Sequence, residues 1–220
     1  MNEHDGASAT GGPDGPPVAV GGPGTTLLDV LGRARTLGFL GPGPVEDHLA
    51  HTAGFLEALR SVTGRVVDLG SGGGVPGLIV AIERPDLELV LVDATAKRCR
   101  FLEEVLQQLS LKATVIEGRA EVVGRGPLRG TADAVVARSF GPPAVTAECA
   151  APLLRPTGLL VVSEPPSGED RWPAGPLEML GLRPLLRTTT APVMQVLVQG
   201  SSCPDEYPRR DGVPAKRPLF

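Results

Sequence analysis

The stretch RVVDLGSGGGVPG, residues 65–77, decides the fold that this sequence predicts. Residues 65–69 form a short run rich in apolar, β-branched residues, and four glycines follow within residues 70–74. Pro76 stands where a helix would begin, a place that suits proline because the first helical position needs no backbone N–H. The stretch therefore predicts a strand, a glycine-rich turn and a helix in direct succession.

The chain on either side repeats this alternation of strand and helix. Consecutive apolar residues predict strands, and apolar residues at helical spacing predict helices between them. We predict strands at residues 65–69, 87–93, 113–117, 132–137 and 158–163, and a closing hairpin at 183–189 and 193–199. Because continuous apolar strands are typical of sheets buried on both faces, we expect an α/β fold with a doubly wound, seven-stranded, mostly parallel sheet.

Composition divides the chain into four regions. Residues 1–24 hold seven glycines and four prolines with almost no large apolar side chain, so we expect a disordered tail there. Apolar spacing predicts two helices near residues 27–40 and 45–60. The predicted regions are thus a Gly/Pro-rich tail (1–24), an N-terminal helical extension (25–62), the main α/β domain (63–203) and a basic C-terminal tail (204–220).

Charge, aromatic content and cysteine spacing exclude several classes of protein. The net charge of −4 gives no global attraction to nucleic acid, and five Phe, one Trp and one Tyr are too few for a base-stacking platform. Cys99, Cys149 and Cys203 lack metal-ligand spacing and suggest no disulfide framework. No apolar stretch is long enough to span a membrane. We expect a cytoplasmic monomer that uses neither a metal nor a membrane.

Two classes of ligand use a glycine loop of this kind. Residues 72–77 match G-x-G-x-x-G, the dinucleotide pattern, and Asp93 lies at a suitable distance to hold a ribose. Residues 68–74 also match D-x-G-x-G-x-G, which is typical of S-adenosylmethionine-dependent methyltransferases. Asp68 favours the second class, because a carboxylate suits a ligand with an ammonium and a sulfonium group but repels a pyrophosphate. A tight turn without a ligand is the third interpretation.

Two further acidic residues follow predicted strands. Asp93 would accept hydrogen bonds from both ribose hydroxyls of S-adenosylmethionine, and its alternative role is a helix cap. Glu121 lies in the turn after the third strand, where it would read the adenine edge, and its alternative role is surface charge. The sequence therefore predicts S-adenosylmethionine as the cofactor.

Five motifs resemble those of the 16S ribosomal RNA guanine-N7 methyltransferases, also called glucose-inhibited division protein B. They are the glycine loop with its Val-Pro-Gly extension (68–77), D-x-x-x-K-R-x-x-F-L (93–102), R-A-E (119–121), A-R-S-F (137–140) and the basic run Y-P-R-R-x-G-x-P-x-K-R-P-L (207–219). The resemblance implies a Rossmann-like class I methyltransferase fold. It also implies methylation of a guanosine N7 in 16S ribosomal RNA, with the small ribosomal subunit as partner.

The resemblance also implies individual roles. With the loop residues, the predicted cofactor-binding set is Asp68, Gly70, Gly72, Gly74, Val75, Asp93, Ala120, Glu121 and Arg138. Arg138 is the predicted catalytic residue, in the cleft beside a methionyl carboxylate or a substrate phosphate; its alternative is a surface arginine. The predicted RNA contacts are Arg209, Arg210, Lys216 and Arg217, in a tail that Pro and Gly keep extended. Their alternative is a solvated terminus that binds nothing.

The chain departs from the family pattern in three places. It lacks the Trp-Asn and Asn-Leu-Thr signatures of the first helices, and His51 and Thr52 replace the Asp and Ser of His-x-x-Asp-Ser. Glu164 and Pro165 replace a Lys-Gly after the fifth strand, and we expect this Glu at the cleft rim to repel RNA phosphates. The alternatives are a divergent methyltransferase for another RNA or a small molecule, and a non-catalytic cofactor-binding RNA or assembly factor.

Overall fold

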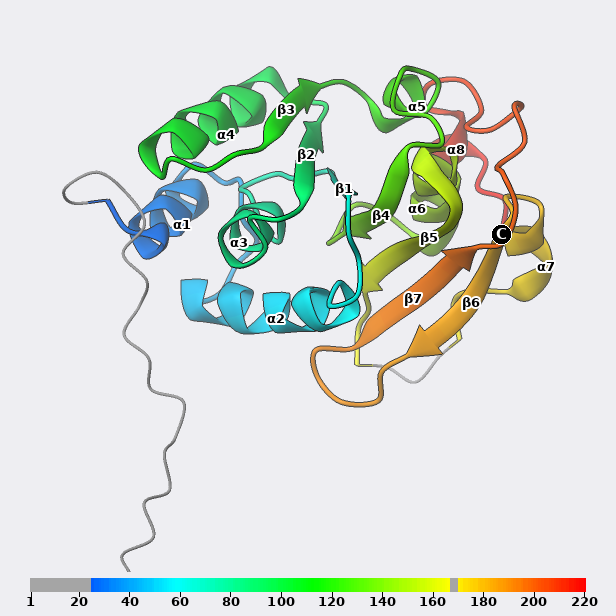
Figure 1. The fold of residues 1–220 in the computed structure, drawn as a ribbon, viewed down its shortest axis with the longest axis horizontal. Helices are drawn as coiled ribbons and strands as arrows, with labels where there is room; N and C mark the ends of the chain where they lie inside the picture. Colours follow the sequence, from blue (N-terminus) through cyan, green and yellow to red (C-terminus); the bar gives the residue numbers. More distant parts are fainter. Residues whose placement is uncertain (1–24, 167–169) are drawn as a thin grey trace, which may run out of the picture.

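A seven-stranded sheet lies between two layers of helices in the computed structural model, which describes residues 25–166 and 170–220 (Figure 1). The strands are β1 (Arg65–Leu69), β2 (Glu88–Asp93), β3 (Thr114–Glu117), β4 (Ala132–Ala137), β5 (Leu154–Ser163), β6 (Leu182–Arg187) and β7 (Met194–Gln199). The helices are α1 (Leu27–Thr36), α2 (Val45–Ala58), α3 (Gly77–Glu83), α4 (Ala96–Gln108), α5 (Ala120–Val123), α6 (Pro143–Ala150), α7 (Ala174–Glu178) and α8 (Val213–Lys216). The predicted disordered tail, residues 1–24, lies outside the described residues.

The strand order confirms the doubly wound sheet. It runs β3-β2-β1-β4-β5-β7-β6, with β1 to β5 parallel and β7 antiparallel to both β5 and β6. The direction of winding reverses between β1 and β4, which are direct neighbours through pairs such as Val67↔Val135. In open α/β sheets, ligands bind beyond the carboxyl ends of the strands at such a reversal. The turn that follows β1 lies at this place.

Side chains of alternate strand residues build two separate cores. One face carries Val67, Val90 and Val135, which pack with α6, α7 and the C-terminal residues Cys203 and Tyr207. The other face carries neighbours of these strand residues, which pack with α1 to α4. Since both faces are covered, the strands read as continuous apolar runs, and this explains why β1 and β4 were predicted with the bounds that the structure has.

Several helix ends differ from the expectation. Helix α1 ends at Thr36 rather than near residue 40, and Thr26 caps its start through reciprocal hydrogen bonds with Asp29. Between β4 and β5 the chain forms α6 and then a 3-10 helix, Ala151–Leu153, and β5 begins at Leu154 rather than at residue 158 as predicted. Three short helices, α5, α7 and α8, were not predicted, because four or five residues carry too little periodicity to be recognised.

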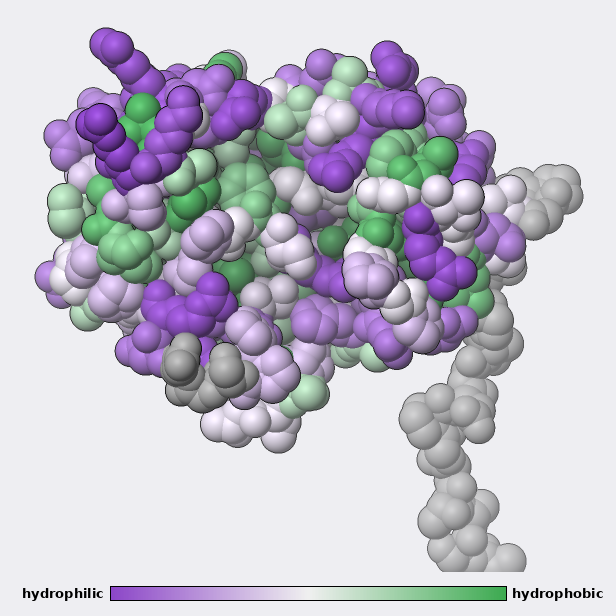
Figure 2. All heavy atoms as spheres, turned by 180° about the vertical axis from the view of Figure 1, so that it is seen from behind, coloured by the Kyte–Doolittle hydropathy of each residue, from purple (hydrophilic) through white to green (hydrophobic). Residues whose placement is uncertain are grey.

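The surface seen from behind carries hydrophilic side chains around its periphery, with smaller hydrophobic patches between them (Figure 2). None of the described helices combines the length and the apolar character needed to cross a membrane. Within residues 25–166 and 170–220, no three His, Cys, Asp or Glu side chains cluster in a way that could hold a metal ion. The three cysteines are all buried.

Candidate functional site

The turn after β1 wraps back onto the neighbouring strand. The backbone N–H groups of Gly70 and Ser71 both donate to the carbonyl of Val92, at 2.8 and 3.0 Å. Gly70, Gly72 and Gly74 all adopt positive φ angles, of 78°, 55° and 93°. Residues other than glycine rarely adopt this backbone conformation, so the shape of the loop requires glycine at these three positions. The loop thus leaves a concave backbone surface at the switch point of the sheet.

A pocket of about 190 Å³ lies on this loop. Its walls come from the loop itself, from the segment between α1 and α2, from α4 and from the end of β4. The lining residues are Phe39, Leu40, Gly41, Gly70, Ser71, Gly72, Gly73, Val75, Arg98, Arg138 and Ser139. Of the predicted cofactor-binding residues, Gly70, Gly72, Val75 and Arg138 line this pocket directly.

Asp68 lies beneath the loop rather than in the pocket wall. Its side chain is buried, and its Oδ2 accepts a hydrogen bond of 3.0 Å from the backbone N–H of Gly77, the first residue of α3. Asp68 therefore fastens the far end of the loop to β1. Burial raises the pKa of Asp68 to about 7, and the nearby carboxylate of Asp93 adds to the rise, while hydrogen bonds from Ser71 and Gly77 and the charge of Arg138 oppose it.

Replacement of Asp68 by Asn is expected to change how stability depends on pH. Between about pH 4 and pH 7 folded Asp68 holds a proton that the unfolded chain has released, so the wild type loses stability as the pH rises through this window. Asp68→Asn keeps an acceptor for Gly77 without the buried charge. At pH 8 it should exceed the wild type by on the order of 2–4 kcal/mol in free energy of unfolding. Urea unfolding of both proteins from pH 4 to pH 8 measures this; parallel curves would contradict it.

Asp93 joins the second strand to the loop. Its Oδ2 accepts from the backbone N–H of Gly72 at 2.9 Å, and its Oδ1 accepts from the N–H of Thr95 at 2.9 Å. Thr95 is the N-cap residue of α4, but its side chain makes no capping hydrogen bond. The carboxylate of Asp93 instead holds the backbone N–H of the N-cap residue itself, and it also lies 3.6 Å from the guanidinium of Arg98. Asp93 is buried and lies outside the lining of the glycine-loop pocket, although a carboxylate oxygen can accept more than one hydrogen bond.

Arg138 lies immediately after β4 and contacts the N-terminal helices. Its guanidinium hydrogen-bonds Nδ1 of His48, a residue of α2. Burial lowers the pKa of Arg138, and the carboxylate of Asp68 opposes this effect. Burial and the charge of Arg138 lower the pKa values of both His48 and His51. Helix α2 therefore presents neutral histidines to the half-buried arginine.

Two residues of this site carried no predicted role. Arg98 lines the pocket, pairs with Asp93 and lies with its guanidinium 5.9 Å from the ring centre of Phe39. His48 holds the guanidinium of Arg138. Both residues belong to motifs that resemble those of the family. The sequence of α2 does not show, however, that this helix packs against the end of β4, where His48 meets Arg138. The sequence therefore shows the types of these two residues but not their contacts.

Ala120 and Glu121 open α5, close to the ends of β2 and β3. Gly118, two residues earlier, donates its N–H to the carbonyl of Asp93 at 3.0 Å. The carboxylate of Glu121 accepts from the N–H of Gly212 at 2.9 Å and from Arg119 at 3.2 Å. Burial alone would raise the pKa of Glu121, but these hydrogen bonds outweigh it and the pKa is lowered. The Glu121 side chain thus holds the C-terminal segment.

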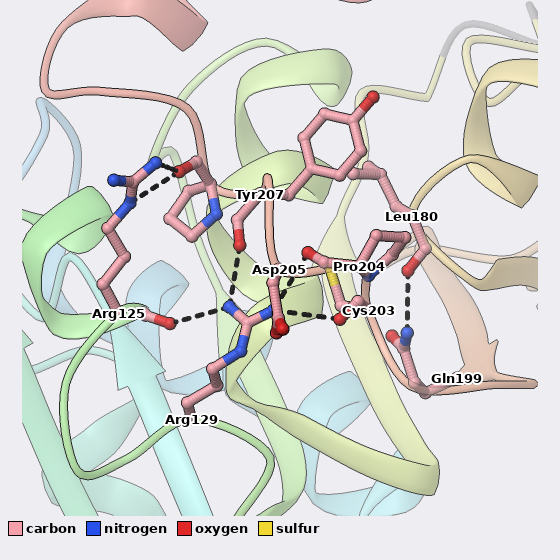
Figure 3. Close-up of polar contacts among 10 residues, drawn as sticks. Arg125, Arg129, Leu180, Gln199, Cys203, Pro204, Asp205 and Tyr207 are labelled. Carbon is pink, nitrogen blue, oxygen red and sulfur yellow. Dashed lines mark hydrogen bonds and ion pairs between the residues drawn. The ribbon is translucent and has the colours of Figure 1, made fainter.

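That C-terminal segment, residues 204–220, is folded onto the domain rather than extended. Arg129 donates to the carbonyls of Cys203, Pro204 and Tyr207 at 2.7–2.9 Å, and Arg125 donates to the carbonyl of Pro208 (Figure 3). Helix α8 closes the segment and packs against α6. The expectation that Pro and Gly keep it extended is therefore wrong, because backbone carbonyls find arginine donors on the turn before β4.

The four basic residues of this segment lie in two different environments. Arg209 pairs with Glu148, a fully buried residue of α6, through three hydrogen bonds of 2.6–2.9 Å from its backbone N–H, Nε and Nη2. Arg210, Lys216 and Arg217 have exposed side chains. Only these three present their charge to solvent.

Glu164 follows β5 and is buried, with a side chain that is 3% exposed. Its Oε2 lies 3.4 Å from Nη1 of Arg171 and 3.4 Å from Nη1 of Arg187. The exposed carboxylate that we expected to repel phosphates is therefore not what the structure shows. Arg171, seven residues further along the chain, and Arg187 of β6 both direct a guanidinium nitrogen to this carboxylate.

The fold and the glycine loop define a class of protein, the methyltransferases with a Rossmann-like class I fold. A solved structure, the SAM-dependent methyltransferase from Aquifex aeolicus, matches with a TM-score of 0.52 over 76% of this chain and 96% of that chain. The two sequences are 15% identical, so this likeness shows the fold alone.

Sequence comparison narrows the class. Ribosomal RNA small subunit methyltransferase G of Syntrophomonas wolfei is 34% identical over 187 residues, which cover 81% of this chain and 87% of that protein. The protein of the same name from Rubrobacter xylanophilus is 36% identical over 210 residues, 88% of this chain and 80% of its own. The family GidB, described as rRNA small subunit methyltransferase G, matches residues 44–174. The chain belongs to this family.

Proposed function

We propose that this protein transfers a methyl group from S-adenosylmethionine to N7 of a guanosine in 16S ribosomal RNA of the small ribosomal subunit. Since ribosomal RNA is the proposed substrate, we propose the cytoplasm as the place where the protein acts. The observation that carries the proposal, in a chain of this family, is that two pockets share a wall. Arg138 and Ser139 line both the pocket on the glycine loop and a second pocket of about 410 Å³ at the ends of β4 and β5.

The residues at the loop fit the proposed cofactor. The concave loop backbone would admit its methionyl part, and Asp93 would accept from the ribose hydroxyls. Ala120 and the backbone of Glu121 would border the adenine, since Glu121 uses its carboxylate for Gly212. Asp68 would act from beneath the loop by holding the N–H of Gly77, and above its pKa of about 7 its negative charge would also favour a cationic ligand. Bound S-adenosylmethionine would supply an electrophilic methyl group.

Arg138 would orient the reactants at the shared wall. Arg138 lines both pockets and its guanidinium is hydrogen-bonded to His48, so it would pair with the methionyl carboxylate or with a phosphate of the target nucleotide. Guanine N7 carries a free lone pair in the neutral base, so the reaction needs alignment and the exclusion of water more than a general base. The neutral histidines and the burial of Arg138 suit such a site.

The exposed basic residues would bind RNA phosphates. We propose that Arg210, Lys216 and Arg217 position the substrate, while Arg209 serves the fold through Glu148. Phosphate contacts of this kind make binding sensitive to salt and carry no sequence information.

Deletion of the gene is expected to remove one N7-methylguanosine from 16S ribosomal RNA. Mass spectrometry of ribosomal RNA fragments from the deletion strain and its parent measures this, and complementation with the wild-type gene should restore the methyl group. The matched control is complementation with Arg138→Met, which keeps the length of the side chain without the charge and should restore little. Unchanged methylation in the deletion strain would contradict the proposal and favour an assembly factor or another substrate.

A further inference from the structure

The second pocket lies beside the proposed methyl-transfer site and has a carboxylate in its wall. Its lining comes from the residues after β4, the residues after β5, His51 of α2 and Arg171. We propose that Glu164 reads the Watson–Crick edge of the target guanine in this pocket. The inference rests on the proposed function and adds to it the residue that selects the base.

Glu164 is held rigidly at the pocket. Its backbone N–H donates to the carbonyl of Val193 at 2.8 Å, which continues the pairing of β5 with β7. Both arginine contacts end on Oε2, so Oε1 takes part in neither ion pair. Because the side chain is already ordered, it loses little conformational entropy when a ligand binds, and its acceptor oxygen points in one direction.

Guanine matches this acceptor, and adenine does not. The Watson–Crick edge of guanine carries two adjacent donors, N1–H and the N2 amino group, whereas adenine presents an acceptor at N1. A carboxylate only accepts hydrogen bonds, so it binds the guanine edge and repels the adenine edge. Enzymes that modify a base commonly read its Watson–Crick edge in a pocket and stack it on an aromatic side chain. Phe140, which lines this pocket, supplies such a ring.

The orientation also suits methylation at N7. N7 lies on the Hoogsteen edge of the purine, in the imidazole ring and away from N1–H and the N2 amino group. A guanine held at its Watson–Crick edge by Glu164 therefore turns N7 away from β5, and the pocket continues on that side to Arg138 and Ser139, the wall shared with the glycine-loop pocket. Arg171 and Arg187 offset the negative charge of the carboxylate, which lowers its repulsion of an anionic nucleotide.

The test compares the binding of three nucleotides to the full chain. Guanosine, inosine and adenosine monophosphates are titrated by NMR or calorimetry, with and without S-adenosylhomocysteine. Inosine monophosphate keeps N1–H and lacks the N2 amino group. We expect guanosine monophosphate to bind about 10-fold more tightly than adenosine monophosphate, with inosine monophosphate between them. Equal affinity of the wild type for guanosine and adenosine monophosphates would overturn the inference.

Two variants assign the preference to Glu164. Glu164→Gln removes the charge, and Glu164→Asp keeps the charge but withdraws the oxygens by one methylene. Both should lose the preference for guanosine monophosphate, while S-adenosylhomocysteine binding stays unchanged. Fluorescence of Trp172 during unfolding reports whether each variant is folded, and Glu164→Asp keeps a charge partner for the arginines if Glu164→Gln unfolds. Glu178→Gln, an exposed acid of α7, is the matched control.

The outcome separates this inference from the proposed function. A preference that survives in a folded variant would overturn the role of Glu164 even if methylation of ribosomal RNA is confirmed. Loss of the preference in both variants would support the role of Glu164 even if the methylated nucleotide proves to lie in another RNA.

Discussion

Replacement of Gly77 by Ala is expected to destabilise the protein by about 1–3 kcal/mol and to abolish measurable cofactor binding. A Cβ on Gly77 would collide with the carboxylate of Asp68 and with the side chain of Leu91. Both neighbours are buried and fixed within adjacent strands, so neither can move without loss of packing. The collision would also break the hydrogen bond from the Gly77 N–H that closes the glycine loop.

Thermal unfolding and calorimetric titration with S-adenosylmethionine measure the two effects of Gly77→Ala. Gly175→Ala is the matched control, because this glycine lies in helix α7 and a Cβ there would meet nothing within 4 Å. The control should be neutral or slightly stabilising, since alanine favours a helix by about 0.5–1 kcal/mol over glycine. If Gly77→Ala binds the cofactor as the wild type does, the loop does not need the closure that the structure shows.

Arg209→Ala is expected to cost about 3–5 kcal/mol of unfolding free energy, although it lies among residues that look like a solvated basic tail. The substitution leaves the carboxylate of Glu148 buried without its guanidinium partner. It also removes one of the contacts that hold the C-terminal segment, leaving those of Arg125, Arg129 and Glu121. The cost should therefore appear as lower resistance to heat and to proteolysis near the C-terminal segment.

The adjacent residue gives the opposite result. Arg210→Ala should leave unfolding unchanged, because the side chain is exposed, and should instead weaken RNA binding and reduce its dependence on salt by about one counterion. Urea unfolding and filter binding to 16S ribosomal RNA fragments at several salt concentrations separate the two variants. Equal loss of stability in both would show that the segment is held as one unit rather than through Glu148.

The sequence predicted what depends on local pattern. Strands β1 and β4 were placed with their observed bounds, because each is a continuous apolar run between turn residues, and the glycine loop was placed at the switch point of the sheet. The role of Gly70 and Gly72 in lining a pocket follows from the same local reasoning. These features need no knowledge of which distant segment packs where.

Contacts that only the tertiary structure brings together could not be predicted from the sequence. Glu164 reads as a lone acid after a strand, and only the fold brings Arg171 and Arg187 to it. Arg209 and Arg210 are identical neighbours in sequence, yet Glu148, 61 positions before Arg209, distinguishes them. Asp68 was predicted as a ligand contact, whereas in the structure it is buried beneath the glycine loop and accepts a hydrogen bond from Gly77. In each case the tertiary structure determines which group contacts the charged side chain.

The pairing of Glu148 with Arg209 also sets an order of events during synthesis. Helix α6 is made well before residue 209, so a nascent chain carries a carboxylate that belongs in the interior but has no guanidinium to accompany it. An uncompensated buried charge opposes docking of that helix until its partner arrives. We therefore expect the domain to finish folding only after residue 209 has left the ribosome.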